Sequence, residues 1–276
     1  MVFDLNSAIT NYPIVAFDTE TSGAYPLESE IIELGAVKWV NGKVVDRFQT
    51  LLKPKKHLEE SNIRIHGITN EMLVAAPLMK DKIQSFCEFI NDSVLLAHHA
   101  PFDLGFLTVD IEEAGLRFPS NVLLCTSLLS RALLPTTNHK LQTLVKELKL
   151  EGGAAHRAAD DAYACMQVFF KCLEKINPDE QNAERLQKIQ SKKLNWLDFQ
   201  LLKDSDAKVK ALAQAALKAE KIEIVYLGGQ NGGKPRPIIP YGIVRNPDGD
   251  YLHALCLIDN ERKRFYLSKI SDYPFS

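Results

Sequence analysis

The chain lacks the apolar run of about 18 residues that a membrane-spanning helix requires. Its first residues, 1–4, contain no basic segment followed by an apolar one, so no secretory signal is expected. Cysteine is scarce: there are five, an odd number, and no two are spaced as C-x-x-C. A disulfide framework and a structural zinc site are therefore both disfavoured. We expect a cytoplasmic protein that does not associate with membranes.

Neither sign of charge dominates, because Lys and Arg number 33 and Asp and Glu number 35, for a formal net charge of −2. This balance excludes a polycationic protein that binds nucleic acid by charge alone. It does not exclude a nucleic-acid enzyme, which needs only a local basic path. The hydrophobic share of 46% is ordinary for a folded protein. At roughly 150 residues per domain, the length indicates about two domains.

The first two thirds of the chain alternate between strand and helix patterns. Residues 13–19, 30–40 and 43–52 read as strands, and Asn41-Gly42 between the last two is a strong hairpin signal. Short apolar strands follow at 93–98 and 121–125, separated by helical patterns that begin at Pro77, at 103–115, at 141–148, and soon after Gly153 up to about Ile176. Three antiparallel strands followed by alternating helices and strands predict a mixed sheet with helices packed on it.

The remaining residues differ in composition. Residues 177–219 are charged, rich in Lys, Gln and Ala, and free of Gly, which predicts a helical connector. Residues 220–276 show Val/Ile/Tyr alternation broken by Gly and Pro, which is typical of a small all-β unit with tight turns. We therefore expect three parts, with boundaries at 1–176, 177–219 and 220–276.

Two carboxylates follow the first predicted strand. Asp18 and Glu20 are two residues apart, so they point to the same face. Carboxylates this close repel each other unless a cation or a shared proton lies between them. An acidic strand end at the surface is the alternative. The apolar run at 14–17 weakens it, because such a run indicates a central strand buried on both faces.

Further acids lie near the starts of predicted helices. Taken alone, Asp103 would be a helix N-cap, and Asp160 and Asp161 would be acids that complement a helix dipole. On a helix, residues five apart point about 140° apart, so His156 can converge with Asp161 only from a loop before the helix. Residues 152–155 supply such a loop. The alternative for His156 is a solvent-exposed loop histidine.

Taken together, these segments form a pattern. The sequences Phe-Asp-Thr-Glu-Thr-Ser-Gly, His-His-Ala-Pro-Phe-Asp-Leu-Gly-Phe-Leu and His-Arg-Ala-Ala-Asp-Asp-Ala occur in that order at 17–23, 98–107 and 156–162. They resemble the three motifs of the DEDDh exonuclease family, which includes the proofreading epsilon subunit of bacterial replicative DNA polymerase, ribonuclease T and oligoribonuclease. The resemblance covers about residues 10–175. It implies an α/β fold, a ribonuclease H-like mixed five-stranded sheet with flanking helices.

The resemblance also implies roles for individual residues: one general base, His156, and four metal-binding acids, Asp18, Glu20, Asp103 and Asp161. Carboxylate oxygens suit hard divalent cations such as Mg²⁺ or Mn²⁺. Two such ions about 4 Å apart can stabilise both the attacking and the leaving oxygen of a phosphodiester. A neutral histidine near pH 7 can take the proton of the attacking water. Asp160 receives no catalytic role, because its direction differs from that of Asp161 by about 100°.

Substrate contacts follow from the same resemblance, which implies that the 3′-terminal nucleotide is held by Thr21, Gly23, His66 and Phe102. The segment His66-Gly67-Ile68-Thr69 is similar to the family's substrate-side segment. For Phe102, a place in the core is as well supported as base stacking. The chain departs from the family at His99, where Asn is common, and at Ser22, where Thr is common. Neither change removes a metal ligand.

The C-terminal region resembles a second family. Residues 250–256 read Asp-Tyr-Leu-His-Ala-Leu-Cys, and an Arg-Lys-Arg run follows at 262–264. The region is similar to the WYL domain, a small barrel of the Sm/SH3-like type, with Asp250 in place of the tryptophan of the naming triplet. Such domains are associated with sensing or binding nucleic acid. Arg262 and Arg264 are candidate contacts to a single strand, and a solvated strand edge is the equal alternative.

The sequence as a whole predicts a metal-dependent 3′→5′ exonuclease. We expect it to release nucleoside 5′-monophosphates from 3′ ends of single-stranded DNA or RNA, with DNA favoured, in DNA repair or RNA turnover. One alternative is a nucleic-acid or nucleotide sensor that acts through the WYL-like domain. Another is a polymerase-associated proofreading subunit, although no obvious sliding-clamp peptide is present. A homodimer, as in several relatives, stays open. The choice between DNA and RNA depends on which protein groups contact the ribose 2′-OH.

Overall fold

A computed structural model describes residues 3–153, 155–229, 232–246 and 248–271. Ala154, part of the loop expected before His156, lies outside the described residues. The chain forms two compact units. The first comprises Met1–Ser22, Ile31–Asp103 and Phe118–Asn195, and the second comprises Gly23–Glu30, Leu104–Arg117 and Trp196–Ser276. Among the described residues, no helix is both long enough and apolar enough to span a membrane.

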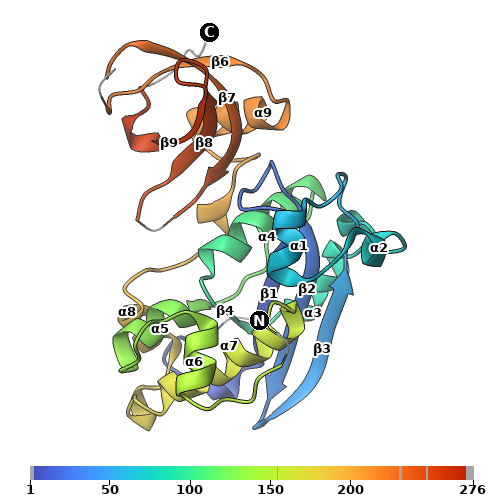
Figure 1. Cartoon of the computed structure of the whole chain (residues 1–276). Helices are drawn as coiled ribbons and strands as arrows, with labels where there is room; N and C mark the ends of the chain where they lie inside the picture. The colour runs from blue at the N-terminus through green and yellow to red at the C-terminus, as the bar shows by residue number, and fades with distance from the viewer. Residues whose placement is uncertain (1–2, 154, 230–231, 247, 272–276) are drawn as a thin grey trace. The chain divides into compact units, whose positions relative to one another are not determined.

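The first unit is built on a five-stranded mixed sheet, drawn in Figure 1, with the strand order β3-β2-β1-β4-β5. Its strands are β1 (Ile14–Thr21), β2 (Ile31–Val40), β3 (Lys43–Leu51), β4 (Val94–Ala97) and β5 (Leu123–Cys125). β1, β2 and β3 pair antiparallel, whereas β4 pairs parallel with both β1 and β5. The predicted mixed sheet is therefore confirmed. Asn41 and Gly42 both have positive φ, 49° and 89°, as a tight hairpin turn requires.

Eight α-helices of the described residues surround this sheet or begin beside it: α1 (Glu60–His66), α2 (Asn70–Leu73), α3 (Ile83–Ile90), α4 (Pro101–Glu113), α5 (Thr126–Leu133), α6 (Leu141–Glu147), α7 (Ala158–Leu173) and α8 (Ala183–Ile189). The predicted helices correspond to α3, α4, α6 and α7. The helix expected from Pro77 begins as a 3₁₀ turn at Met79–Asp81 and becomes α3 only at Ile83. The sequence patterns did not predict α1, α2 and α5.

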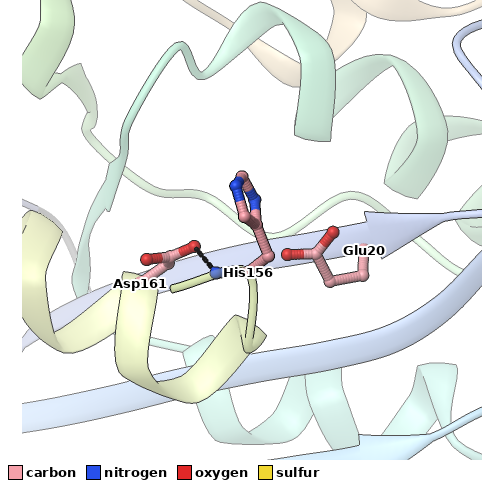
Figure 2. Close-up of side chains that lie close together, drawn as sticks. All are labelled: Glu20, His156 and Asp161. Atoms are coloured by element: carbon pink, nitrogen blue, oxygen red, sulfur yellow. Dashed lines mark hydrogen bonds between the residues drawn. The ribbon is translucent and has the colours of Figure 1, made fainter. Parts of the chain in front are cut away.

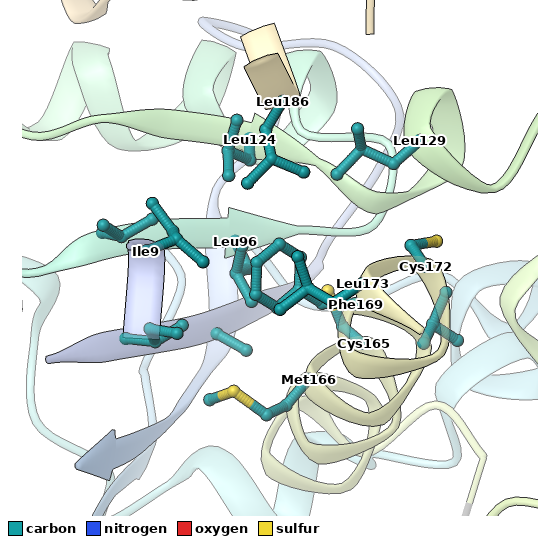
Figure 3. Close-up of a cluster of buried hydrophobic side chains, with 14 of the residues drawn as sticks. Ile9, Leu96, Leu124, Leu129, Cys165, Met166, Phe169, Cys172, Leu173 and Leu186 are labelled. Atoms are coloured by element: carbon teal, nitrogen blue, oxygen red, sulfur yellow. The ribbon is translucent and has the colours of Figure 1, made fainter. Parts of the chain in front are cut away.

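β1 is buried on both faces, as its apolar run predicted. On one face, Ile14 and Ala16 lie in the main hydrophobic cluster, to which α7 contributes Phe169 (Figure 3). On the other face, Phe17 packs edge-on against Phe86 of α3, with ring centroids 6.1 Å apart. Because side chains alternate along a strand, Asp18 and Glu20 continue the face of Ile14 and Ala16, which is the face that α7 covers.

The second unit contains a four-stranded antiparallel sheet. Its strands, in the order β6-β7-β8-β9, are β6 (Ile222–Val225), β7 (Pro235–Val244), β8 (Tyr251–Cys256) and β9 (Glu261–Tyr266). The helix α9 (Ala207–Leu217) packs on β7, with Leu212 in a core that includes Ile238 and Phe265. The separate all-β unit is what the composition predicted. The helices of residues 177–219 are divided between the two units, with α8 in the first and α9 in the second. The boundaries expected at 176 and 219 stay predictions.

A close approach between β2 and α7 depends on a glycine. A Cβ atom at Gly35 would lie 2.2 Å from the backbone nitrogen of Ala159 and 2.3 Å from the carbonyl carbon of Ala158. Both are backbone atoms in the first turn of α7, so they cannot move aside as the end of a side chain could. Gly35 therefore lets the start of α7 touch the sheet directly opposite Asp18, its partner in the strand register.

We expect Gly35→Ala to lower the free energy of unfolding by about 2–3 kcal/mol, because overpacking against fixed backbone forces a shift of the helix. Urea denaturation followed by circular dichroism measures this change. Gly152→Ala is the matched control, since a Cβ there meets only Val145 Cγ1 at an ordinary 3.6 Å. Equal stability of the two variants would contradict the close approach.

Candidate active site

Three of the predicted site residues converge at the carboxyl end of β1. Glu20, His156 and Asp161 each offer one ligand atom, and these atoms all lie within 4.8 Å of one another. Figure 2 shows Glu20 on one side of His156 and Asp161 on the other. Glu20 and Asp161 are buried, whereas His156 is exposed. The arrangement combines two carboxylates with an imidazole that solvent can reach.

The backbone before α7 determines where His156 points. His156 lies two residues before the helix, as convergence with Asp161 required, and has a left-handed φ of 61°. Its backbone N–H donates to Oδ2 of Asp161 at 3.0 Å. The other oxygen of Asp161, Oδ1, accepts from Nε2 of Gln142 on α6 at 2.9 Å. Asp161 is thus fixed from two directions by neutral donors, which orient its carboxylate without neutralising it.

Asp103, in the first turn of α4, is held by β1. Its Oδ1 accepts from the backbone N–H of Thr19 at 3.0 Å and from the Thr19 hydroxyl at 2.8 Å. Asp103 is only 2% exposed, so these bonds replace the water that the carboxylate loses. The side chain therefore binds the strand between Asp18 and Glu20 and does not act as the N-cap that its sequence position also suggested.

The four acids form a single electrostatic cluster. Burial, followed by repulsion from Asp103, Asp161 and Glu20, raises the pKa of Asp18 well above its ordinary value. Burial and the charge of Asp161 raise the pKa of Glu20 to about 8. Burial raises the pKa of Asp103 to about 7, although the bonds from Thr19 oppose the shift. The pKa of Asp161 is also raised, mainly by burial. Such mutual repulsion makes the cluster a site for cations or protons.

The predicted substrate contacts lie on different elements. Thr21 is the last residue of β1, and Phe102 is half-buried at the start of α4. Gly23 lies just past β1, where the chain enters the second unit. His66 ends α1 and is 6% exposed. Thr21, Phe102 and His66 belong to the same unit as the acids.

His66 has one buried nitrogen without a partner. Its Nδ1 accepts from the backbone N–H of Ile68 at 3.0 Å, so in the neutral ring the proton lies on Nε2. Nε2 makes no hydrogen bond with any described residue. Burial, and to a smaller extent the charge of nearby His156, lowers the pKa of His66. A neutral donor is therefore left buried and unsatisfied, at a cost of about 1–3 kcal/mol.

Two departures from the motif pattern also have a place in the first unit. His99 has a left-handed φ of 67°, a conformation that Asn adopts more readily than most residues. Ser22 accepts a hydrogen bond through its backbone oxygen from Nδ2 of Asn62 on α1. That bond joins the end of β1 to the helix that ends in His66.

Four residues around the site escaped the sequence analysis: Thr19, Gln142, Glu33 and Arg157. Thr19 alternates away from the face of its neighbours, so the strand pattern gave no reason to choose it. Gln142 lies on the amphipathic helix predicted at 141–148, where a polar residue reads as solvated. Glu33 lies in the apolar strand pattern at 30–40, where nothing in the sequence distinguishes it from an acid exposed to solvent. Only its complete burial and its bonds to Arg157 distinguish it.

The predicted basic contacts belong to the second unit. On β9, Arg262 pairs with Glu28 at 3.2 Å and lies over the ring of Tyr241. Arg264 lies over the ring of Tyr251. Arg262 and Arg264 are therefore set among aromatic rings, as a single-strand surface would need, but Arg262 already has a carboxylate partner.

Asp250, the residue in place of tryptophan, has a clear structural role. Its Oδ2 accepts from Nη1 of Arg245 at 2.6 Å, and its Oδ1 accepts from the backbone N–H of Asn246 at 2.9 Å. Arg245 also pairs with Asp204. The acid thus connects the segment before β8 to Arg245.

Comparisons with known proteins agree with this geometry. The chain belongs to the exonuclease family, whose model, described as "Exonuclease", matches residues 15–169, more than half of the chain. A second model, described as "WYL domain", matches residues 207–274. Both resemblances inferred from the motifs are therefore confirmed.

The chain is similar in sequence to proteins described as DNA polymerase III PolC-type. It is 39% identical over 161 residues to the DNA polymerase III PolC-type of Halalkalibacterium halodurans, covering 58% of this chain and 11% of the relative. It is 30% identical over 275 residues to the corresponding protein of Thermotoga petrophila, covering 97% of this chain and 19% of the relative. The chain thus spans between about a tenth and a fifth of these relatives.

Solved exonucleases share the fold. A structure titled exonuclease X in complex with 5′ overhanging duplex DNA has a TM-score of 0.50 and 26% identity, and the match covers 64% of this chain and 98% of that one. E. coli exonuclease I in complex with a dA16 oligonucleotide has a TM-score of 0.53 at 16% identity, with coverage of 88% and 55%. The second likeness is one of fold alone.

The raised carboxyl pKa values predict how the metal-free protein responds to pH. Unfolded carboxyls titrate near pH 4, whereas Asp103 and Glu20 in the fold titrate at about 7 and about 8. Between these limits the folded protein binds more protons, so its stability is greatest at low pH and falls as the pH rises. We expect the Tm in EDTA to fall from about pH 6 to about pH 8.5.

Millimolar Mg²⁺ should raise the Tm more at the upper pH than at the lower one, because a cation replaces the missing protons. Thermal melts followed by circular dichroism at both pH values, with EDTA or Mg²⁺, measure this. Asp18→Asn should flatten the pH dependence, since it removes one of the repelling charges. A Tm in EDTA that rises over this pH range would show that the acids do not share a charge cluster.

Proposed function

We propose that the protein is a metal-dependent 3′→5′ exonuclease that hydrolyses single-stranded nucleic acid, with DNA favoured, to nucleoside 5′-monophosphates. The observation that carries the proposal is the convergence of Glu20, His156 and Asp161 within 4.8 Å at the end of β1. Membership of the exonuclease family supports the reaction class.

The donor set fits hard divalent cations. The cluster offers carboxylate oxygens and one imidazole and contains no thiolate, which favours Mg²⁺ or Mn²⁺. The raised pKa of Asp18, caused by burial and then by the neighbouring acids, supports a cluster that lacks positive charge. We assign the cations to Asp18, Glu20, Asp103 and Asp161. Asp18 lies on β1, the central strand of the sheet, and would hold the cations together with the other three acids.

Each residue then has a distinct part in hydrolysis. Bound divalent ions would stabilise the charge on the attacking and leaving oxygens of the phosphodiester. His156, exposed beside Glu20 and Asp161, accepts the proton of the attacking water. His66 donates from its unpartnered Nε2 to an oxygen of the terminal nucleotide. Thr21, Gly23 and Phe102 are the remaining candidates to hold that nucleotide.

DNA is the favoured substrate because the similar proteins are described as DNA polymerases or were solved with DNA. The sequence relatives are DNA polymerases of the PolC type, and two structural neighbours were solved with DNA. The same likeness supports a second setting, proofreading beside a polymerase. The match to the Thermotoga petrophila protein covers 97% of the chain and so includes the WYL residues 207–274, which means that the WYL domain does not separate the two settings.

We expect Asp18→Ala to reduce kcat at least about 10³-fold, because the ions stabilise the transition state by several kcal/mol. His156→Ala should reduce kcat about 10²–10⁴-fold, as the loss of a general base does. Asp160→Ala is the matched control and should retain near wild-type turnover, since the side chain of Asp160 leaves the helix about 100° from that of Asp161. The assay follows a 5′-labelled single strand with Mg²⁺ or Mn²⁺, with circular dichroism to confirm folding.

The same assay tests polarity and substrate. A 5′-labelled strand should shorten in single-nucleotide steps, and a phosphorothioate at the last 3′ linkage should slow the reaction. Matched DNA and RNA strands compare the two sugars. No degradation of either strand under a broad range of metal and pH would refute the proposed function, as would cleavage that begins at the 5′ end.

A second candidate function, nucleotide sensing, is favoured by a cavity in the second unit. The cavity measures about 230 Å³ and is lined by Tyr226, Gly228, Gly229, Arg236, Asp259, Lys263, Arg264 and Phe265. The Arg236 side chain is 9% exposed and lies 3.3 Å from Asp259, which also pairs with Lys263. Two cations share one carboxylate, so the pocket is suited to an anion the size of a phosphate group.

If this pocket is the functional site, we expect a nucleoside 5′-monophosphate to bind the Asp18→Ala variant with unchanged affinity. Lys263→Ala should weaken that binding about tenfold, the effect of removing one charge-assisted hydrogen bond. Isothermal titration calorimetry measures both, and Lys269→Ala serves as a control for charge. Binding that Asp18→Ala abolishes and Lys263→Ala spares would assign the nucleotide to the carboxylate cluster instead.

A further inference from the structure

A fifth carboxylate lies beside the four metal-binding candidates. Glu33 on β2 is directly opposite Glu20 in the strand register and is completely buried. Adjacent positions in an antiparallel pair place their Cβ atoms about 5 Å apart. A glutamate so close to the candidate metal-binding cluster is either a further metal ligand or a residue bound only to protein groups. Its hydrogen bonds distinguish these two roles.

Every acceptor position of Glu33 is taken. Oε1 accepts from Nη2 of Arg157 at 2.8 Å and from Nε2 of Gln49 at 3.0 Å. Oε2 accepts from Nε of Arg157 at 3.1 Å and from the backbone N–H of Ala158 at 3.1 Å. A carboxylate has about four lone-pair positions, so none is left for a cation.

The electrostatics agree with the hydrogen bonds. Burial alone would raise the pKa of Glu33, but the bonds from Arg157, Gln49 and Ala158 outweigh it, and the pKa lies below its ordinary value. This is the opposite of the shift at Glu20. The charge of Glu33 is therefore balanced by Arg157 and by hydrogen bonds, whereas the charges of the neighbouring acids are not. Glu33 is not one of the metal ligands.

The bonds of Glu33 hold the turn that carries His156. Arg157 is the N-cap residue of α7, and its side chain does not cap the helix. Glu33 supplies the missing acceptor to Ala158 and grips the guanidinium of Arg157 in a fork. His156, one residue earlier, is kept in a left-handed conformation that costs a non-glycine residue about 1–2 kcal/mol. Such strain persists only where neighbouring contacts enforce it.

We propose that Glu33 is a positioning residue for His156: by fixing Arg157 and the first amide of α7, it directs the imidazole toward Glu20 and Asp161. The role rests on the function proposed above, because it gives the general base its orientation. Gly35, two residues further on the same face of β2, lets the helix come close enough for the carboxylate to reach.

Three variants test this role. Glu33→Gln keeps the volume but loses the charge, and its amide cannot accept from all four donors. Arg157→Lys keeps the positive charge near Glu20 but loses the fork. Gln49→Ala is the matched control, because it removes a donor to the same carboxylate from β3, away from the turn. We expect kcat to fall about 10²-fold in Glu33→Gln and by a smaller factor in Arg157→Lys, as misplaced catalytic groups do.

KM and the affinity for Mn²⁺, measured by electron paramagnetic resonance, should stay close to wild type in both variants, and Gln49→Ala should leave kcat nearly unchanged. A readout independent of activity is the imidazole NMR signal of His156, assigned with His156→Ala. We expect it to sharpen and move toward the position of a mobile histidine in Glu33→Gln. Gln49→Ala should leave the signal where it is.

Other outcomes overturn the inference. A lower Tm with kcat and the His156 signal unchanged would make Glu33 purely structural. A loss of Mn²⁺ affinity as large as the loss of kcat would make it a ligand. If Glu33→Gln does not fold, Arg157→Lys decides, since the Arg157 side chain is 35% exposed. If the wild-type protein cleaves nothing, the proposed function fails, whereas the His156 signal still decides whether Glu33 positions the imidazole.

Discussion

Repulsion among carboxylates at the end of β1 is the constraint on which the site depends. The acids there repel one another, and the side-chain donors to two of them are neutral: Thr19 donates to Asp103, and Gln142 donates to Asp161. Neutral donors fix direction without cancelling charge. The fold therefore supplies geometry and leaves the charge deficit to be met by protons or divalent cations, which is why the pKa of Glu20 rises to about 8 through burial and the nearby acids.

One strand organises the approach of α7 to this cluster. On the face of β2 that α7 covers, Gly35 lies opposite Asp18 and Glu33 lies opposite Glu20. The glycine provides room for the first turn of the helix, and the glutamate binds its first amide. Gly35 and Glu33, two residues apart, therefore set both the distance of the helix start from the sheet and its rotation. The positions of Asp161 and of the turn before α7 depend on this placement.

Several features of the fold and the candidate site could be predicted from the sequence because they depend on residues that are close together in the chain. Alternation along β1 put Asp18 and Glu20 on one face, the Asn41-Gly42 turn fixed the hairpin, and residues 152–155 implied that His156 precedes its helix. The motif order supplied Asp103. What these residues share is a short-range pattern, either a strand period or a fixed spacing.

The residues that sequence reasoning missed act across long separations. Glu33 meets Arg157 over 124 positions and Thr19 meets Asp103 over 84. Nothing in an apolar strand marks one acid as fully bonded, and nothing in an amphipathic helix marks Gln142 as a support for Asp161. Such pairings are decided by packing in three dimensions. The helix α1 was missed because its two apolar residues, Ile63 and Ile65, are two positions apart, which is not a helical spacing.

The same charge that attracts cations works against the substrate. Nucleic acid is a polyanion, and a cluster of unneutralised carboxylates repels a phosphodiester as it repels itself. The chain as a whole, with a net charge of −2, offers no compensating field. The proposed cations would therefore serve two purposes, since they would relieve the repulsion among the acids and make the site able to receive a phosphate. In the proposed function, metal binding and substrate binding are coupled by electrostatics before any chemistry begins.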